Sequence, residues 1–303
     1  MTENSFEIKF NKIAIVGLGL LGGSLAIDLR LLSPDIEIIG IARRQETLIE
    51  AELLKIDDIK IFSKLSNDIT DCAGCDLIVL CTPVQTIIDQ LAQLSSFVKI
   101  GTIITDVGST KRAIMNSASA VIPMGIYFVG GHPMAGSDKA GLSHAHAGLY
   151  KGATWALCEN EKSGESVDKL FELIASLGAS PIIIDADSHD DVVSLTSHLP
   201  HLVASALVNA VFSSNYEELA LPFMAGGFRD TTRVAAGNPA LWRDILMTNR
   251  DRVLTSLTKL IVELSIWREA LQTADEPYLE ALLSNASERR VMVNKVRKWK
   301  SIE

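Results

Sequence analysis

The first half of the chain alternates short apolar runs with longer segments of mixed polarity. The runs are rich in Ile and Val and are predicted to be strands: Lys12–Gly17, Ile36–Ile41, Asp76–Cys81, Ile100–Asp106, Ile126–Gly130, Ala153–Cys158 and Pro181–Asp185. Between residues 12 and 106 the intervening segments are long enough for crossover helices, which favours parallel strands. The runs are continuously apolar rather than alternating, as expected for a doubly wound sheet covered on both faces.

The pattern changes after Asp185. Helical periodicity replaces strand-like alternation, most clearly over Leu246–Leu271 and Leu279–Val296. The segment Ser188-His-Asp-Asp191 has the S-x-x-D form of a capping box and is predicted to open a helix that runs toward Phe212. We therefore expect an α/β domain over residues 1–185 and an all-α domain over residues 186–303.

Charge and hydropathy narrow the class of protein. The 303 residues include 28 Lys and Arg against 37 Asp and Glu, a net charge of −9, which argues against binding to nucleic-acid phosphates. The apolar stretch Ile13–Leu21 contains two glycines and is shorter than the roughly 20 residues that span a bilayer. Met1–Phe10 is neither basic nor apolar enough for a signal peptide. We expect a cytoplasmic protein with no membrane partner.

The cysteines are predicted to be buried core residues rather than part of a metal or redox site. The four cysteines are Cys72, Cys75, Cys81 and Cys158, and the first two form a C-x-x-C motif. This motif lacks a second pair at ligand spacing, whereas a structural zinc ion takes four ligands. We interpret the cysteines as small buried apolar residues and expect no metal.

A glycine-rich segment follows the first predicted strand. Gly17-Leu-Gly19-Leu-Leu-Gly22 has the G-x-G-x-x-G form and leads directly into a predicted helix. In this context the glycines permit a tight turn and a close backbone approach, while the helix N-terminus offers N–H groups to a pyrophosphate. The motif predicts a Rossmann-type dinucleotide-binding fold, with contacts from Gly17, Gly19, Leu20, Leu21 and Gly22.

The end of the second predicted strand bears on the choice of nucleotide. NAD-binding proteins usually place an acid there, about 20 residues beyond the glycines, but here Ala42 is followed by Arg43 and Arg44. Guanidinium groups bind phosphate strongly, so we expect NADP to be favoured, with NAD as the alternative. The alternative is that one or both arginines simply lie in solvent at the end of the strand and bind no phosphate. Further contacts are expected from Thr47 and from Cys81, Thr82 and Pro83, which shape the backbone near the ribose.

Four further segments carry a resemblance. They are Thr105-Asp-Val-Gly-Ser109-Thr-Lys111, Gly130-Gly-His132-Pro-Met-Ala-Gly136-Ser-Asp138, Ser197-His198-Leu-Pro-His201, and Gly226-Gly-Phe-Arg229-Asp230-Thr-Thr-Arg233, with Asn238-Pro-Ala-Leu-Trp242 following. Together with the glycine loop they resemble the prephenate/arogenate dehydrogenase family, in the family's order from about Lys12 to about Asn249. The resemblance implies NAD(P)-dependent oxidative decarboxylation of prephenate, with arogenate as the alternative substrate. A non-catalytic NADP-sensing protein and a β-hydroxyacid dehydrogenase are the competing hypotheses.

The resemblance assigns the reacting groups. His132 corresponds to the hydrogen-bond acceptor for the substrate hydroxyl, a role that suits histidine because its ordinary pKa of about 6.5 leaves it neutral in the cytoplasm. Ser109 corresponds to the serine that bonds both the substrate hydroxyl and this histidine. A simple N-cap for a helix beginning near Lys111 explains Ser109 equally well.

The remaining site residues are also implied by the resemblance. Arg233 corresponds to the arginine that pairs with a substrate carboxylate, and Arg229 is either a second cation or the partner of Asp230 in a surface ion pair. Asp138 occupies a position where many members carry an acid. His198 and His201, three residues apart, are expected in the substrate pocket, with Pro200 kinking their helix. They lack further ligands at metal-binding spacing.

In the family the helical half forms a homodimer. Three of the four tryptophans, Trp242, Trp267 and Trp299, fall in this half and are compatible with a buried dimer interface. An ordinary core would explain them equally well.

Overall fold

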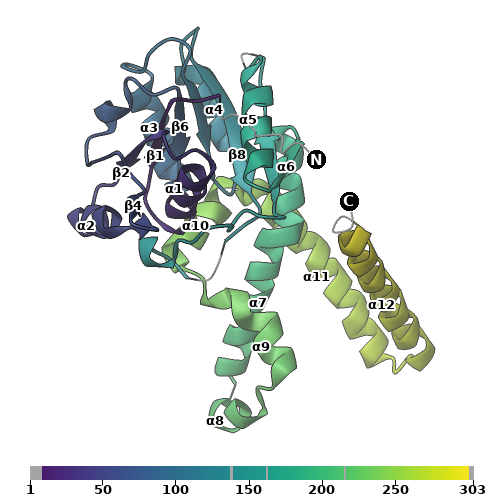
Figure 1. Ribbon diagram of the computed structural model, residues 1–303. Helices are drawn as coiled ribbons and strands as arrows, with labels where there is room; N and C mark the ends of the chain where they lie inside the picture. The colour runs from purple at the N-terminus through teal and green to yellow at the C-terminus, as the bar shows by residue number, and fades with distance from the viewer. Residues whose placement is uncertain (1–8, 137–138, 162, 215, 300–303) are drawn as a thin grey trace. The chain divides into compact units, whose positions relative to one another are not determined.

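A computed structural model describes residues 9–136, 139–161, 163–214 and 216–299, and it contains one eight-stranded sheet (Figure 1). The strand order is β10-β9-β8-β7-β6-β1-β2-β5. Neighbours are parallel except for β8 and β9. The strands are β1 (Lys12–Val16), β2 (Glu37–Ile41), β5 (Lys64–Ser66), β6 (Leu77–Leu80), β7 (Ile103–Asp106), β8 (Tyr127–Pro133), β9 (Thr154–Cys158) and β10 (Ser180–Ile183).

All seven predicted strands are therefore present. The edge strand β5 and a hairpin of β3 (Lys55–Ile56) and β4 (Ile59–Lys60) were not predicted, because each is only two or three residues long. The predicted strands between residues 12 and 106 are parallel as expected, and the antiparallel β8–β9 pair lies beyond them.

Helices cover both faces of the sheet, as the continuously apolar strands predicted. On one face Ile13 and Ile15 of β1 pack with residues of α1 (Leu20–Leu32) and α5 (Ser166–Ser176). On the other face Ala14 and Val16 pack with α3 (Val84–Leu94) and α4 (Arg112–Val121). Cys72 and Cys75 are buried in this second cluster, and burial raises the pKa of Cys75 to about 11, so both thiols are core residues.

The order of the strands places a topological switch point at the carboxyl ends of β1 and β6. The chain leaves β1 toward β2 on one side, while β6 pairs with β1 on the other. Ligands of open α/β sheets bind at such a switch point. The glycine loop after β1 and the segment Cys81–Pro83 after β6 both lie there.

The chain after β10 is helical, as predicted. The described helices are α6 (Ala186–Val193), α7 (Leu199–Phe212), α8 (Glu217–Ala220), α9 (Gly226–Thr232), α10 (Pro239–Thr248), α11 (Arg250–Gln272) and α12 (Glu276–Trp299). Short turns lie between some of them, including η4 (Leu221–Phe223) and η5 (Arg233–Ala236). The capping residue of α6 is Asp185, whose side chain accepts from the Ser188 N–H at 2.8 Å. The expectation that Ser188 opens this helix is therefore wrong by three residues.

Between α6 and α7 lies a π-helical turn, Ser194–His198, in which the N–H of Leu199 bonds to the carbonyl of Ser194. Pro200 follows directly and has no N–H to continue the α-helical ladder. The local irregularity expected from Pro200 thus takes the form of a widened turn. This turn carries His198.

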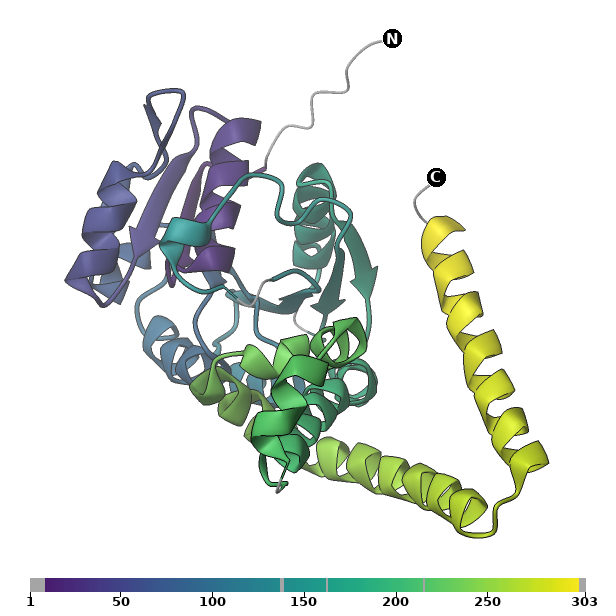
Figure 2. The same ribbon diagram turned by 90° about the horizontal axis from the view of Figure 1, so that it is seen from below.

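The chain divides into two compact units, residues 1–250 and residues 251–303. The first contains the sheet together with α6 to α10. The second contains most of α11 and all of α12, two long helices that meet at residues 273–275 (Figure 2).

Candidate active site

His132 lies in β8 near its carboxyl end. Because β1, β6, β7 and β8 run parallel, this end of β8 is at the same edge of the sheet as the glycine loop. The side chain is 9% exposed. The predicted acceptor is therefore a shielded group at the cofactor-binding edge.

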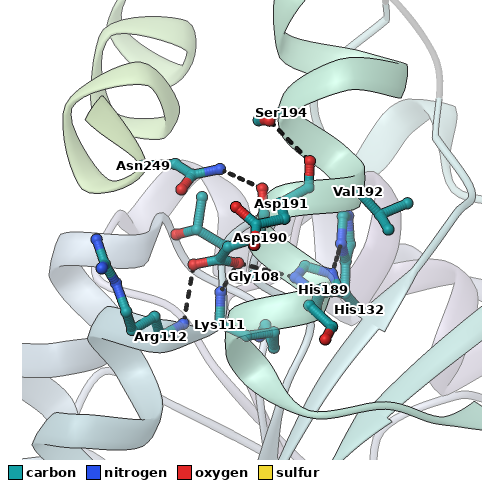
Figure 3. A network of polar contacts seen from close by, with 12 residues as sticks. Gly108, Lys111, Arg112, His132, His189, Asp190, Asp191, Val192, Ser194 and Asn249 are labelled. Atoms are coloured by element: carbon teal, nitrogen blue, oxygen red, sulfur yellow. Dashed lines mark hydrogen bonds and ion pairs between the residues drawn. The ribbon is translucent and has the colours of Figure 1, made fainter. Parts of the chain in front are cut away.

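A chain of polar side chains extends behind His132 (Figure 3). Its Nδ1 lies 2.9 Å from Nε2 of His189, and Nδ1 of His189 lies 2.8 Å from Oδ1 of Asp190. His189 and Asp190 are neighbours in the first turns of α6, and both are buried. Two elements 57 residues apart thus converge on one hydrogen-bonded network.

Asp190 also caps α4. Its Oδ1 accepts the backbone N–H of Lys111 at 2.7 Å, and its Oδ2 accepts that of Arg112 at 3.0 Å. These groups are among the N–H donors that a helix start leaves without an intrahelical partner. The N-cap position of α4 is Lys111. Ser109 is not that cap and instead lies, partly exposed, in the turn between β7 and α4.

A buried ion pair fastens β7 to β8 beside His132. Nζ of Lys111 pairs with Oδ2 of Asp106 and donates to the carbonyl of Gly131 at 2.7 Å. Oδ1 of Asp106 accepts the Gly131 N–H at 3.0 Å. Since Gly131 directly precedes His132, the pair fixes the backbone that carries the imidazole.

Burial and neighbouring charges determine the protonation of the network. Burial, together with the nearby His189 and Lys111, lowers the pKa of His132 well below its ordinary value. Burial tends to raise the pKa of Asp190, but hydrogen bonds from His189, Lys111 and Arg112 outweigh it and the net shift is downward. At neutral pH His132 is therefore neutral and Asp190 is a carboxylate.

His198 and His201 gather around Trp242. The ring of His201 stacks on Trp242 with centroids 3.6 Å apart, and His198 meets it edge-on at 6.3 Å. Burial lowers the pKa of His198 to about 4 and also lowers that of His201. Nδ1 of His201 is buried and has no hydrogen-bond partner among the described residues, so a ligand or a water molecule can satisfy it.

Asn249, at the end of α10, joins the two groups of histidines. Its Nδ2 donates to the backbone carbonyl of Asp190 at 2.8 Å and lies 3.3 Å from Nδ1 of His198. The side chain is fully buried. The histidines of the π-helical turn and of β8 therefore belong to one connected set.

The predicted cations lie on the surface. Arg233 is an exposed residue at the start of η5, which packs against α7, and Arg229 is exposed on α9. Arg229 and Asp230 make no ion pair within the described part of the chain, so the surface pair expected between them is wrong. Asp138 lies outside the described residues.

The glycine loop has the shape that a dinucleotide requires. Gly17 has φ +102°, and a Cβ there would lie 2.7 Å from the carbonyl oxygen of Cys81, while a Cβ on Gly22 would lie 2.1 Å from the oxygen of Gly17. A Cβ on Gly19, in contrast, would meet nothing within 4 Å. Gly19 is also the N-cap of α1, with no side chain bonded to the first N–H groups. The helix start therefore faces open space where a phosphate fits.

The other predicted cofactor residues follow the strands β2 and β6. Arg43 and Arg44 are exposed after β2, while Ala42 and Thr47 are buried. Thr82 donates to Oε1 of Gln90 at 2.7 Å, and Pro83 is the N-cap of α3. Both arginine side chains are thus accessible to a ligand.

Sequence reasoning missed four members of the site: His189, Asp190, Trp242 and Asn249. The first two stood in the segment interpreted only as a capping box, and Trp242 was grouped with a dimer interface or a core. Among the residues that the structure describes, no group of three or more His, Cys, Asp or Glu is arranged to hold a metal ion.

The chain is similar in sequence to proteins of one known family. Residues 25–183 match the family model described as "prephenate dehydrogenase, nucleotide-binding domain", and residues 185–285 match "prephenate dehydrogenase, dimerization domain". The prephenate dehydrogenase of Bacillus subtilis is 36% identical over 281 residues, 92% of this chain and 75% of the relative.

Two solved structures are similar over nearly their full length. Synechocystis arogenate dehydrogenase is 32% identical with a TM-score of 0.80, covering 93% of this chain and 99% of that one. Prephenate dehydrogenase from Aquifex aeolicus, in complex with hydroxyphenyl propionate and NAD+, is 29% identical with a TM-score of 0.83, covering 93% and 98%.

Proposed function

The chain belongs to the prephenate dehydrogenase family, and on this premise we propose that it converts prephenate to 4-hydroxyphenylpyruvate with NAD(P) in tyrosine biosynthesis. The observation that carries the proposal is the position of His132, a buried neutral imidazole at the sheet edge that also holds the glycine loop. A base and a dinucleotide site at one edge are what this reaction requires.

The chemistry defines the roles. The hydroxyl proton of prephenate is removed and a hydride leaves C4, after which carbon dioxide departs and the ring becomes aromatic. When bound, the nicotinamide supplies the hydride acceptor. We assign His132 as the acceptor of the hydroxyl proton, with Ser109 as a hydrogen-bonding partner of the same hydroxyl.

Recognition of the two substrate carboxylates is assigned to the helical part of the chain. Arg233 is the proposed partner of one carboxylate, because its planar fork matches a carboxylate bidentately. Arg229, exposed and unpaired with Asp230, is available as a second cation. His198 and His201 are proposed to line the pocket, with Trp242 holding the ring of His201. Asp138 is retained as a proposed contact.

For the cofactor we propose NADP over NAD. The open space at Gly19 and the uncapped start of α1 fit the pyrophosphate of either nucleotide. The exposed guanidinium groups of Arg43 and Arg44, which stand where an acid would bind the ribose 2′-hydroxyl, support the 2′-phosphate. The A. aeolicus relative is described with NAD+, so the two nucleotides are to be compared directly.

Steady-state turnover of prephenate and arogenate, each with NADP and NAD, tests the proposal. We expect the highest kcat/KM with prephenate and NADP. Negligible turnover in all four combinations would overturn the enzyme assignment and favour a nucleotide-sensing protein. Simple hydroxyacids are the control substrates for a β-hydroxyacid dehydrogenase.

Arogenate is the second candidate substrate, because the similar Synechocystis structure is an arogenate dehydrogenase. Arogenate differs from prephenate by an amine in place of the side-chain keto oxygen. A kcat/KM ratio in favour of arogenate in the same assay would assign that activity instead.

We propose a homodimer formed through the helices, since residues 185–285 match a dimerization domain. The helix Ala186–Phe212 is long and apolar enough to cross a membrane, and only 17% of its most apolar window is buried within the chain. It also carries the buried polar groups His189, Asp190 and His198. We therefore attribute its exposed apolar side chains to subunit contact and propose a cytoplasmic enzyme without a membrane or nucleic-acid partner.

A further inference from the structure

The hydrogen bonds behind His132 define the direction in which each proton points. Both oxygens of Asp190 accept backbone N–H groups, and Oδ1 additionally faces Nδ1 of His189 at 2.8 Å. An ionised carboxylate only accepts hydrogen bonds. Nδ1 of His189 must therefore carry a hydrogen and donate it to Asp190.

The tautomer of His189 then sets that of His132. In its neutral form His189 has one N–H, so donation from Nδ1 leaves its Nε2 as an acceptor. The atom facing this acceptor, at 2.9 Å, is Nδ1 of His132 (Figure 3). Nδ1 of His132 therefore donates to His189. Its only hydrogen is then used, and Nε2 on the other side of the ring keeps a free electron pair.

This tautomer matters because the alternative would be inactive. With the hydrogen on Nε2, His132 would present a donor to the substrate hydroxyl and could not take its proton. Burial keeps His132 neutral but does not by itself select a nitrogen. The selection comes from the hydrogen bond that the other nitrogen makes.

We propose that His189 and Asp190 are positioning residues that hold His132 in the tautomer with an unprotonated Nε2. This inference rests on the proposed function of His132 as the acceptor of the hydroxyl proton. Asp190 orients His189, His189 accepts from Nδ1 of His132, and the electron pair on Nε2 faces away from this relay. His189 and Asp190 act through His132.

Substitutions at residue 189 separate positioning from packing. In His189→Leu the acceptor for Nδ1 of His132 is lost, and we expect kcat to fall about 100-fold with KM changed less than about threefold. In His189→Gln the amide oxygen can accept the same hydrogen, so kcat should recover to within about tenfold of the wild type. Equal activity in the wild type and His189→Leu would overturn the proposal, as would a lack of recovery in His189→Gln.

Asp190→Asn tests the hydrogen bond between Asp190 and His189, with Thr248→Val as the matched control. The Thr248 hydroxyl bonds that of Thr110 at 3.0 Å, across the same junction but outside the relay. We expect kcat to fall at least about tenfold in Asp190→Asn, whereas Thr248→Val should lose stability without losing kcat. A comparable loss of kcat in both variants would reduce Asp190 to a structural role and overturn the proposal.

Nitrogen-15 NMR of histidine-labelled protein reads the tautomer without any substrate. In the wild type at pH 7.5, about one unit above the ordinary pKa of histidine, His132 should show a protonated Nδ1 and an unprotonated Nε2. The pattern should be lost in His189→Leu and kept in His189→Gln. The opposite tautomer in the wild type would overturn the relay even if prephenate is turned over. The expected tautomer in a protein that turns over neither substrate would instead refute the proposed function alone.

Discussion

At the scale of single residues, the site depends on groups held in protonation states that differ from those in water. His132 and His198 are buried and neutral, whereas the equally buried Asp190 keeps its charge because three N–H groups surround it. The sequence motif was enough to propose His132 as the proton acceptor. The partner of His132 could not be predicted, because His189 is 57 residues away and its neighbours in the sequence also fit a simple helix start.

The acceptor role of His132 predicts the effect of His132→Asn. The amide can occupy similar space and hydrogen-bond to His189, but it cannot take up a proton. Turnover should fall at least about 100-fold, while the affinity for NADP, measured by fluorescence titration, stays within a few-fold. A variant that remained active would show that another group accepts the proton.

Arg43→Ala should change the preference between the two nucleotides. Loss of the guanidinium removes a charge-assisted bond that only the 2′-phosphate can make, so KM for NADP should rise about tenfold or more while KM for NAD changes little. Arg44→Ala, at the N-cap of α2 (Gln45–Leu53), should shift the preference in the same direction, because the Arg44 guanidinium is assigned to the same phosphate. An equal rise in KM for both nucleotides would contradict a role for Arg43 in recognising the phosphate.

His198 makes the free energy of unfolding depend on pH. Its pKa is about 4 in the folded chain and about 6.5 when unfolded, so the unfolded state binds more protons between these values. Stability is therefore fully present above pH 6.5 and falls as the pH drops toward 4, by up to about 3 kcal/mol. The lowered pKa of His132 also makes the free energy of unfolding decrease as the pH falls.

Urea unfolding at pH 7 and pH 5 measures this loss. His198→Gln can keep a hydrogen bond with Asn249 but has no proton to bind, so its stability should change less between the two pH values. The same pH dependence in both proteins would show that His198 is not the group responsible.

At the scale of elements, the loop after β1 and the helix starts position much of the proposed site. The strand–glycine–helix pattern could be predicted because the strand, the loop and the helix follow one another in the sequence. The structure adds that Gly17 also lies against the distant carbonyl of Cys81, which the pattern did not show. The cap of α4 could not be predicted, because a side chain of α6 provides it. Pro200 indicated an irregular helix. Whether the irregularity is a π-helical turn or a kink depends on which backbone carbonyls remain hydrogen-bonded, and the sequence does not specify this.

The glycine loop separates folding from cofactor binding. In Gly22→Ala the new Cβ would lie 2.1 Å from the Gly17 oxygen, so we expect a loss of about 1–3 kcal/mol in the free energy of unfolding. In Gly19→Ala the Cβ enters open space, so the fold should be kept while KM for the nucleotide rises about tenfold. Thermal unfolding and cofactor titration of both variants distinguish the effects. Unchanged cofactor affinity in Gly19→Ala would contradict a phosphate at this position.

At the scale of the whole molecule, apolar side chains remain exposed along the helices. In the segment matched to the dimerization domain they include Leu195, Val203, Leu207, Phe212, Ile261, Val262 and Leu264. Apolar exposure of this kind marks interaction surfaces. Sequence periodicity predicted the helical second half of the chain and seven of the strands. It did not distinguish faces packed within one chain from faces packed against a second chain, because both have the same apolar spacing.

A charge on this surface should weaken subunit association. Leu207 of α7 is 37% exposed, and we expect Leu207→Arg to raise the dimer dissociation constant by about tenfold or more, as measured by sedimentation. Ile100→Arg is the control, because Ile100 is 82% exposed and precedes β7. Equal dissociation of both variants, or none, would contradict an interface on α7.

The capping of α4 by Asp190 has a consequence for recombination between relatives. At the start of α4 the aspartate contacts main-chain hydrogens at positions 111 and 112, which every amino acid except proline provides. A graft that brings in a foreign helical segment with an aspartate at position 190 therefore keeps the cap of α4 whichever side chains stand at positions 111 and 112. The lysine and arginine at those two positions are free to diverge as far as this contact is concerned.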